Sequence, residues 1–137
     1  MKDFRGTGVA MVTPFKADKS VDYFALEKLT EHLITGGVDY LVVQGTTGES
    51  ATLTQSEKQD VLSAVIRKNA GRLPLVWGHG GNNTQALRDG FNEFDLTGVD
   101  AVLAASPYYN KPTQAGIIAH YNAYADASPK PVILYNV

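Results

Sequence analysis

Cysteine is absent from the 137-residue sequence, which excludes disulfide bonds, thiolate zinc sites and thiol nucleophiles. Neither sign of charge is in large excess, because 12 Lys and Arg residues face 14 Asp and Glu residues, so we expect no nucleic-acid partner. No apolar run approaches the ~18 residues of a membrane-spanning helix, and the opening residues MKDF do not predict a signal peptide. With 44% hydrophobic and 19% charged residues, the composition is that of a globular domain, and the lack of cysteine favours a cytoplasmic location.

Short apolar runs alternate along the chain with longer amphipathic stretches. We predict five strands, at residues 8–12, 40–44, 75–77, 101–104 and 132–136, and four helices, at residues 23–35, from Thr54 to about Gly71, 84–96 and 113–127. Asp22 is the expected N-cap of the first helix, and Thr54 with Glu57 forms a capping box before the second. The runs recur about every 30 residues, which is the size of one strand–helix unit. Strands that are apolar on both faces are typical of a parallel sheet covered by helices.

Two α/β architectures fit five such units. One is an open, doubly wound five-stranded sheet, which a chain of this length could complete. The other is the first half of a (β/α)₈ TIM barrel, which typically needs ~250 residues. The run 132–137 has no following helix to cover it, and this favours the barrel. We therefore expect residues 1–137 to form a single partial domain that supplies about the first four and a half βα units of a barrel.

The residues expected at the carboxyl ends of the strands carry the functional signal, because ligands bind at that edge in both architectures. The loop GTTGE at 45–49 places Thr46 and Thr47 between two glycines, which is the composition of a small anion receptor or of an ordinary strand–helix turn. It is not a P-loop, because no lysine follows the second glycine. Glu49 is expected to anchor this loop rather than act as a base.

Tyrosines follow the fourth strand at Tyr108 and Tyr109 and end the fifth strand at Tyr135. Phenols can move protons when a neighbouring hydroxyl relays them, although tyrosine is also common at the ends of sheets. His79 follows the third strand without partners for a metal site or a catalytic triad, so we expect it to make a structural hydrogen bond. None of the eight lysines lies at a predicted strand end, where amine catalysis would need one.

Four segments together resemble the dihydrodipicolinate synthase family. They are VTP at 12–14, GTTGESATL at 45–53, PYYNKP at 107–112 and LYNV at 134–137. The resemblance covers the whole chain in order. It implies a (β/α)₈ barrel and a lyase of lysine and diaminopimelate biosynthesis that joins pyruvate to L-aspartate-4-semialdehyde through a lysine Schiff base. It implies no organic cofactor and no catalytic metal, and it places the Schiff-base lysine on the sixth strand, outside residues 1–137.

The resemblance also suggests individual roles. Thr46, Tyr109 and Tyr135 match the family's proton-relay triad, and Thr47 with the backbone of Thr46 matches its pyruvate-carboxylate site. Tyr109 is the member that reaches into a neighbouring subunit, which implies a homo-oligomer built as a dimer of dimers. Without the missing lysine, the isolated chain is expected to be inactive.

A possible allosteric lysine site matches Ser50, Ala51, Asn82 and Tyr108. Lysine-sensitive members of the family carry histidines and a glutamate where this chain has Gln55, Lys58 and Ala86. We therefore predict weak or absent inhibition by lysine.

Two alternatives remain open at this point. An N-acetylneuraminate lyase-like aldolase would share the barrel and the Schiff base, but that family usually has serine in place of Thr46 and lacks the tyrosine pair 108–109. A non-enzymatic open-sheet binding module, such as a receiver or flavin-binding domain, would need acids or a phosphate loop at strand ends that lack them here.

Overall fold

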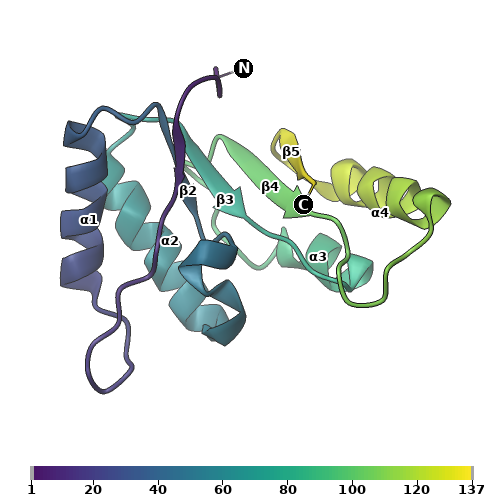
Figure 1. The fold of residues 1–137 in the computed structure, drawn as a ribbon, viewed down its shortest axis with the longest axis horizontal. Helices are drawn as coiled ribbons and strands as arrows, with labels where there is room; N and C mark the ends of the chain where they lie inside the picture. Colours follow the sequence, from purple (N-terminus) through teal and green to yellow (C-terminus); the bar gives the residue numbers. More distant parts are fainter. Residues whose placement is uncertain (1, 137) are drawn as a thin grey trace.

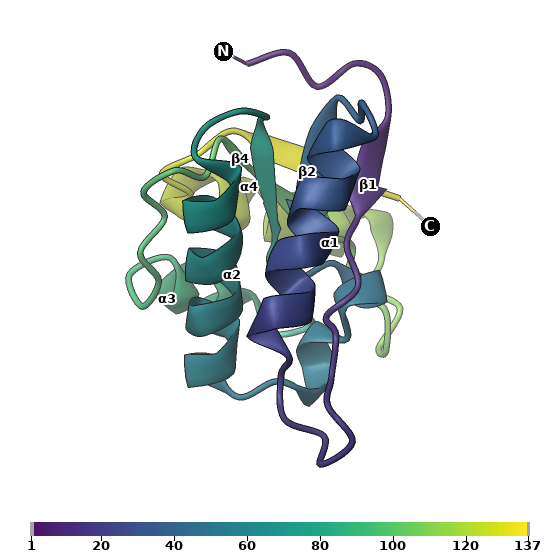
Figure 2. The ribbon, with the colours of Figure 1, turned by 90° about the vertical axis from the view of Figure 1, so that its left-hand side faces the viewer.

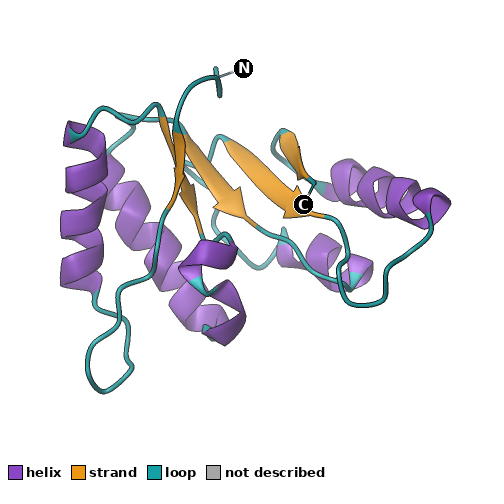
Figure 3. Ribbon diagram, in the orientation of Figure 1, coloured by secondary structure: helices purple, strands orange, loops and turns teal. Residues whose placement is uncertain are grey.

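The computed structural model describes residues 2–136 and contains one sheet of five parallel strands, which lie side by side in chain order (Figures 1 and 3). The strands are β1 (Gly8–Ala10), β2 (Tyr40–Val43), β3 (Leu75–Gly78), β4 (Ala101–Ala105) and β5 (Val132–Tyr135), and the connecting helices are α1 (Tyr23–Thr35), α2 (Gln55–Asn69), α3 (Thr84–Gly90) and α4 (Gln114–Ala127). A doubly wound sheet would reverse its strand order at a switch point. The sequential order excludes that alternative and confirms the first half of a (β/α)₈ barrel.

The helices all pack on one face of the curled sheet, where α1 and α2 lie side by side (Figure 2). Alternate strand residues, such as Leu41, Val43 and Trp77, point into this main core and are almost completely buried. The parallel register places Val42 next to Val76 on the opposite face, where a second and smaller apolar cluster forms. A closed barrel fills its interior with residues of this second kind.

Local sequence signals set the starts of the helices as predicted. Asp22 caps α1, because its carboxylate accepts a hydrogen bond from the N–H of Ala25 at 2.9 Å. Thr54 and Glu57 form both bonds of the capping box at the start of α2. That helix ends at Asn69, just before Gly71.

Some element ends differ from the prediction. The third helix was expected to run to residue 96 but ends at Gly90, where the N–H groups of Phe91, Asn92 and Glu93 bind carbonyls three residues back instead of four. The chain then continues in tight turns, and the N–H of Asp95 binds Gln59 on α2 instead of a helical carbonyl. The second strand stops one residue early, because Gln44 has a left-handed backbone with a φ of 60°.

The last strand is only partly covered. Val132 packs against the main core, whereas Leu134 is 62% exposed and Tyr135 is 46% exposed. Leu134 therefore lacks a covering helix within the described residues. Val137, which belongs to the same apolar run, lies outside the described residues.

Candidate functional site

The paired threonines lie at the carboxyl end of β2, in a single 3₁₀ turn that covers Thr46–Gly48. Gly48 and Glu49 donate the hydrogen bonds of this turn, to the carbonyls of Gly45 and Thr46. Both threonine side chains are exposed, and their N–H groups belong to the open first residues of the turn. One short, exposed turn therefore carries two hydroxyl donors and two amide donors, which is the composition of an anion receptor.

The segment that follows β1 packs against this turn. Thr13 is buried, and its hydroxyl donates a 2.7 Å hydrogen bond to the carbonyl of Gly48. A Cβ at Gly48 would lie 3.1 Å from the carbonyl oxygen of Met11, so the turn packs closely on the residue that follows the first strand. Glu49 anchors the loop through its left-handed main chain, while its side chain is exposed.

The predicted catalytic tyrosines occupy two further strand ends. Tyr135 is the last residue of β5 and aligns with Ala105 of β4, in the same alternation as Leu103 and Ile133 of the barrel-interior cluster. Tyr109 lies in the loop after β4 and is 86% exposed. Within residues 2–136 no hydrogen bond joins these two tyrosines to Thr46, which lies across β3 and β4 from Tyr135.

A buried aromatic group lies beneath the ends of β3 and β4. The ring of His79 stacks on Trp77 with 4.2 Å between centroids, and its Nε2 bonds the carbonyl of Leu87 at 2.8 Å. Burial lowers the pKa of His79, which favours the neutral ring. Tyr124 of α4 donates a 2.7 Å hydrogen bond to the main-chain carbonyl of the same histidine. The structural role expected for His79 is thus confirmed.

Gln44, just before the threonine loop, has a buried side chain that sequence reasoning did not identify. Its Oε1 accepts a hydrogen bond from the indole N–H of Trp77 at 2.9 Å, and its Nε2 donates to the carbonyl of Lys58 at 2.5 Å. The one local signal for this role in the sequence is that a polar residue directly follows the four strand residues Tyr40–Val43.

A small cavity of about 90 Å³ opens behind the threonine loop, between α2 and α3. Ser50, which was predicted to belong to an allosteric site, lines it together with Gln55, Lys58 and Ala86. Glu93 also lines the cavity and accepts a hydrogen bond from the side chain of Gln55. The cavity is therefore lined by one positively charged side chain, Lys58, and one negatively charged side chain, Glu93.

The other predicted allosteric residues are arranged differently. Asn82 and Tyr108 meet, because the carboxamide oxygen of Asn82 accepts a 2.8 Å hydrogen bond from the N–H of Tyr108. Ala51 is exposed and does not line the cavity.

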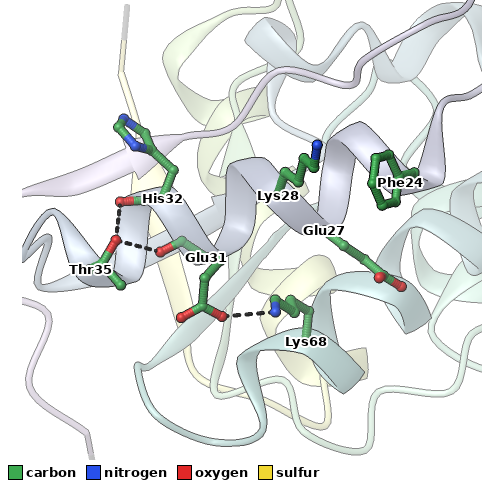
Figure 4. Close-up of a pocket in the computed structure, with 7 residues that line it drawn as sticks. All are labelled: Phe24, Glu27, Lys28, Glu31, His32, Thr35 and Lys68. Atoms are coloured by element: carbon green, nitrogen blue, oxygen red, sulfur yellow. Dashed lines mark hydrogen bonds and ion pairs between the residues drawn. The ribbon is translucent and has the colours of Figure 1, made fainter.

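A wider hollow of about 400 Å³ lies on the outer surface of α1 and α2 (Figure 4). Its walls are charged side chains such as Glu27, Lys28 and Glu31, together with the ring of Phe24. None of these residues lies at the carboxyl end of a strand, so this hollow is not the predicted site.

The described residues offer neither a metal centre nor a membrane helix. Across 2–136, the histidine, aspartate and glutamate side chains form no group of three that could hold a metal ion. No helix in the described part of the chain is both long and apolar enough to cross a bilayer.

Comparison with known proteins identifies the family. The model of the dihydrodipicolinate synthetase family matches residues 3–137. A 4-hydroxy-tetrahydrodipicolinate synthase from Flavobacterium psychrophilum is 57% identical over 137 residues, which are 100% of this chain and 47% of that protein. The crystal structure of dihydrodipicolinate synthase DapA-2 from Bacillus anthracis is 46% identical with a TM-score of 0.93, and the match covers 100% of this chain and 47% of that one.

A further solved structure is the chloride-inhibited dihydrodipicolinate synthase from Acinetobacter baumannii complexed with pyruvate. It is 43% identical with a TM-score of 0.93, and the match covers 98% of this chain and 46% of that one. The chain spans about half the length of the relatives it matches. The chain belongs to the dihydrodipicolinate synthetase family, and its five strands form the N-terminal part of that family's (β/α)₈ barrel.

Proposed function

We propose that residues 1–137 supply the first half of a 4-hydroxy-tetrahydrodipicolinate synthase, a cytoplasmic lyase that condenses pyruvate with L-aspartate-4-semialdehyde. The observation that carries the proposal is the threonine pair at the carboxyl end of β2, in a chain that belongs to this family. Several of its relatives carry this synthase name, and the Acinetobacter relative was solved with pyruvate.

In this proposal, Thr47 and the main chain of Thr46 hold the carboxylate of pyruvate. The turn favours this role, because it presents exposed donors and no competing carboxylate hydrogen bond. A charge-assisted hydrogen bond contributes about 1.5–3 kcal/mol, so Thr47→Val should raise the KM for pyruvate by ~10–150-fold. The exposed Thr97, which precedes β4, offers Thr97→Val as a matched control with an unchanged KM.

Proton transfer is assigned to Tyr135, with Thr46 and Tyr109 as the other members of the relay. Tyr135 is the last residue of its strand and lies in register with the barrel-interior residues. A residue that transfers protons to a Schiff base at the carboxyl ends of the strands needs this position. Tyr109 is 86% exposed on its loop, which fits a side chain that enters a neighbouring subunit of a dimer of dimers. Tyr135→Phe should lower kcat by ~10²–10⁴-fold, the usual worth of general acid–base catalysis.

The Schiff-base lysine belongs to the half-barrel that would complete this one. No lysine belongs to a described strand, so no strand within residues 2–136 carries an amine at its carboxyl end. We test this by joining residues 1–137 to the second half of the Flavobacterium psychrophilum enzyme and measuring synthase turnover. The fusion should be active and residues 1–137 alone inactive, whereas turnover by the isolated chain would contradict the proposal.

The small cavity behind the threonine loop is proposed as a lysine site that binds its ligand weakly. Lys58 brings a positive charge to the cavity and Ala86 brings no polar group, and both features disfavour a cationic ligand, while the carboxylate of Glu93 is already hydrogen-bonded to Gln55. Lysine should therefore inhibit the fusion weakly or not at all. Strong inhibition at sub-millimolar lysine would show that the cavity binds this amino acid well.

A further inference from the structure

Gln44 combines two unfavourable features at the residue that leads into the threonine loop. Its side chain is 3% exposed, and a buried carboxamide loses its hydrogen bonds to water. Its backbone has a φ of 60°, a left-handed conformation that a side chain with a Cβ adopts only at a cost. A residue in such a conformation persists where its surroundings compensate for that cost.

The compensation comes from the elements on either side of the loop. The carboxamide accepts from Trp77 on β3 at 2.9 Å and donates to the carbonyl of Lys58 in the first turn of α2 at 2.5 Å. The loop 45–54 leaves β2 at Gln44 and enters α2 directly afterwards. One side chain therefore ties the start of the loop to the helix at its end and to the neighbouring strand.

Gly78 of β3 packs directly against the peptide between Gln44 and Gly45. A Cβ at position 78 would lie 2.5 Å from the carbonyl oxygen of Gln44 and 2.6 Å from the N–H nitrogen of Gly45. The peptide between these two residues thus crosses directly over the end of β3. The two hydrogen bonds of the Gln44 side chain and the close approach of Gly78 together restrict the orientation of the Gln44–Gly45 peptide, and therefore the direction in which the chain leads to Thr46.

We propose that Gln44 is a positioning residue that fixes where Thr46 and Thr47 present their donors to the carboxylate of pyruvate. The inference deepens the proposed function and rests on it for the identity of the ligand. Gln44 itself is buried and does not touch substrate in this account. Its effect is transmitted through the direction of the Gln44–Gly45 peptide.

The first test measures the loop without catalysis, in the 137-residue chain. Gln44→Met keeps the length of the side chain and removes both hydrogen bonds. The amides of Gly48 and Glu49, which close the 3₁₀ turn, should then exchange with solvent about tenfold faster relative to core amides. Gln59→Met, which also removes two hydrogen bonds of a half-buried glutamine, is the matched control and should leave these two amides unchanged.

The second test uses the fusion with the Flavobacterium half. Gln44→Met should raise the KM for pyruvate by about tenfold with a smaller change in kcat, and the control should change neither. Exchange at Gly48 and Glu49 that rises only as much as in the core would overturn the positioning role. If Gln44→Met speeds exchange at Gly48 and Glu49 but the unsubstituted fusion is inactive, the proposed function is contradicted and the positioning role is not. If Gln44→Met does not fold, Gln44→Asn replaces it, because asparagine tolerates the left-handed backbone and its shorter carboxamide cannot reach both Trp77 and Lys58.

Discussion

The hydrogen bond between Tyr124 and the carbonyl of His79 gives a direct test of the buried core beneath the strand ends. Tyr124 is completely buried on α4, and its phenol donates this bond at 2.7 Å. Burial raises the pKa of the phenol, so it remains a donor throughout the neutral range. Tyr124→Phe retains the ring, which packs edge-on against Phe91 at 5.0 Å, and removes this donor.

The cost of the substitution follows from the carbonyl that is left behind. A hydrogen bond contributes about 0.5–1.5 kcal/mol, and an unpaired buried acceptor costs about 1–3 kcal/mol. We therefore expect Tyr124→Phe to reduce the free energy of unfolding by about 1.5 kcal/mol. With a urea m-value of about 2 kcal/mol per molar, the unfolding midpoint should fall by about 0.75 M.

Urea unfolding can be followed by the fluorescence of Trp77, which is the single tryptophan of the sequence and is buried next to His79. Tyr108→Phe is the control, because Tyr108 is 67% exposed and its substitution should change stability by less than about 0.5 kcal/mol. An unchanged midpoint in Tyr124→Phe, or equal shifts in the two variants, would refute the reasoning.

Two other variants test local interactions in α1 and α2. Thr54→Ala removes the capping box and should cost about 1 kcal/mol in the same urea assay, so an unchanged midpoint would contradict the cap. Glu31 is held at a pKa of about 2, first by hydrogen bonds from Arg72 and then by Lys68 (Figure 4 shows the lysine contact). The lowered pKa of Glu31 stabilises the fold at pH values above about 4.5, the ordinary pKa of this carboxyl group, and this stabilisation is lost as the pH falls towards 2. Glu31→Gln should therefore be less stable than the parent at pH 6 and equal to it at pH 2. A stability difference that does not change with pH would show that this ion pair does not contribute.

Local features of the fold could be predicted from the sequence because their causes lie within a few residues. The caps at Asp22 and Thr54 depend on side chains three residues from the N–H groups they bind. The end of α3 could not be predicted in this way, since the segment that follows it is held by a side chain distant in the sequence, that of Gln59, which accepts a hydrogen bond from the N–H of Asp95. The strand order also required the structure, although the uncovered last run favoured the correct architecture.

The candidate site was predictable only in part for the same reason. The threonine pair is visible because both residues lie in one short loop. The role of Gln44 could not be predicted, because its partners Trp77 and Lys58 belong to two other elements, which only the fold brings close to it. The relay of Thr46, Tyr109 and Tyr135 remains a prediction.

In the proposed function, this half-barrel binds pyruvate but needs a lysine from the other half to react with it. Borohydride reduction in the presence of pyruvate, followed by peptide mass spectrometry, tests both parts of this claim. A lysine of the added half should gain the mass of one pyruvate less one water plus the two hydrogens of reduction, and Thr47→Val should lower the yield of this adduct at limiting pyruvate. An adduct on any lysine within residues 1–137, or no adduct on a folded fusion, would contradict the account.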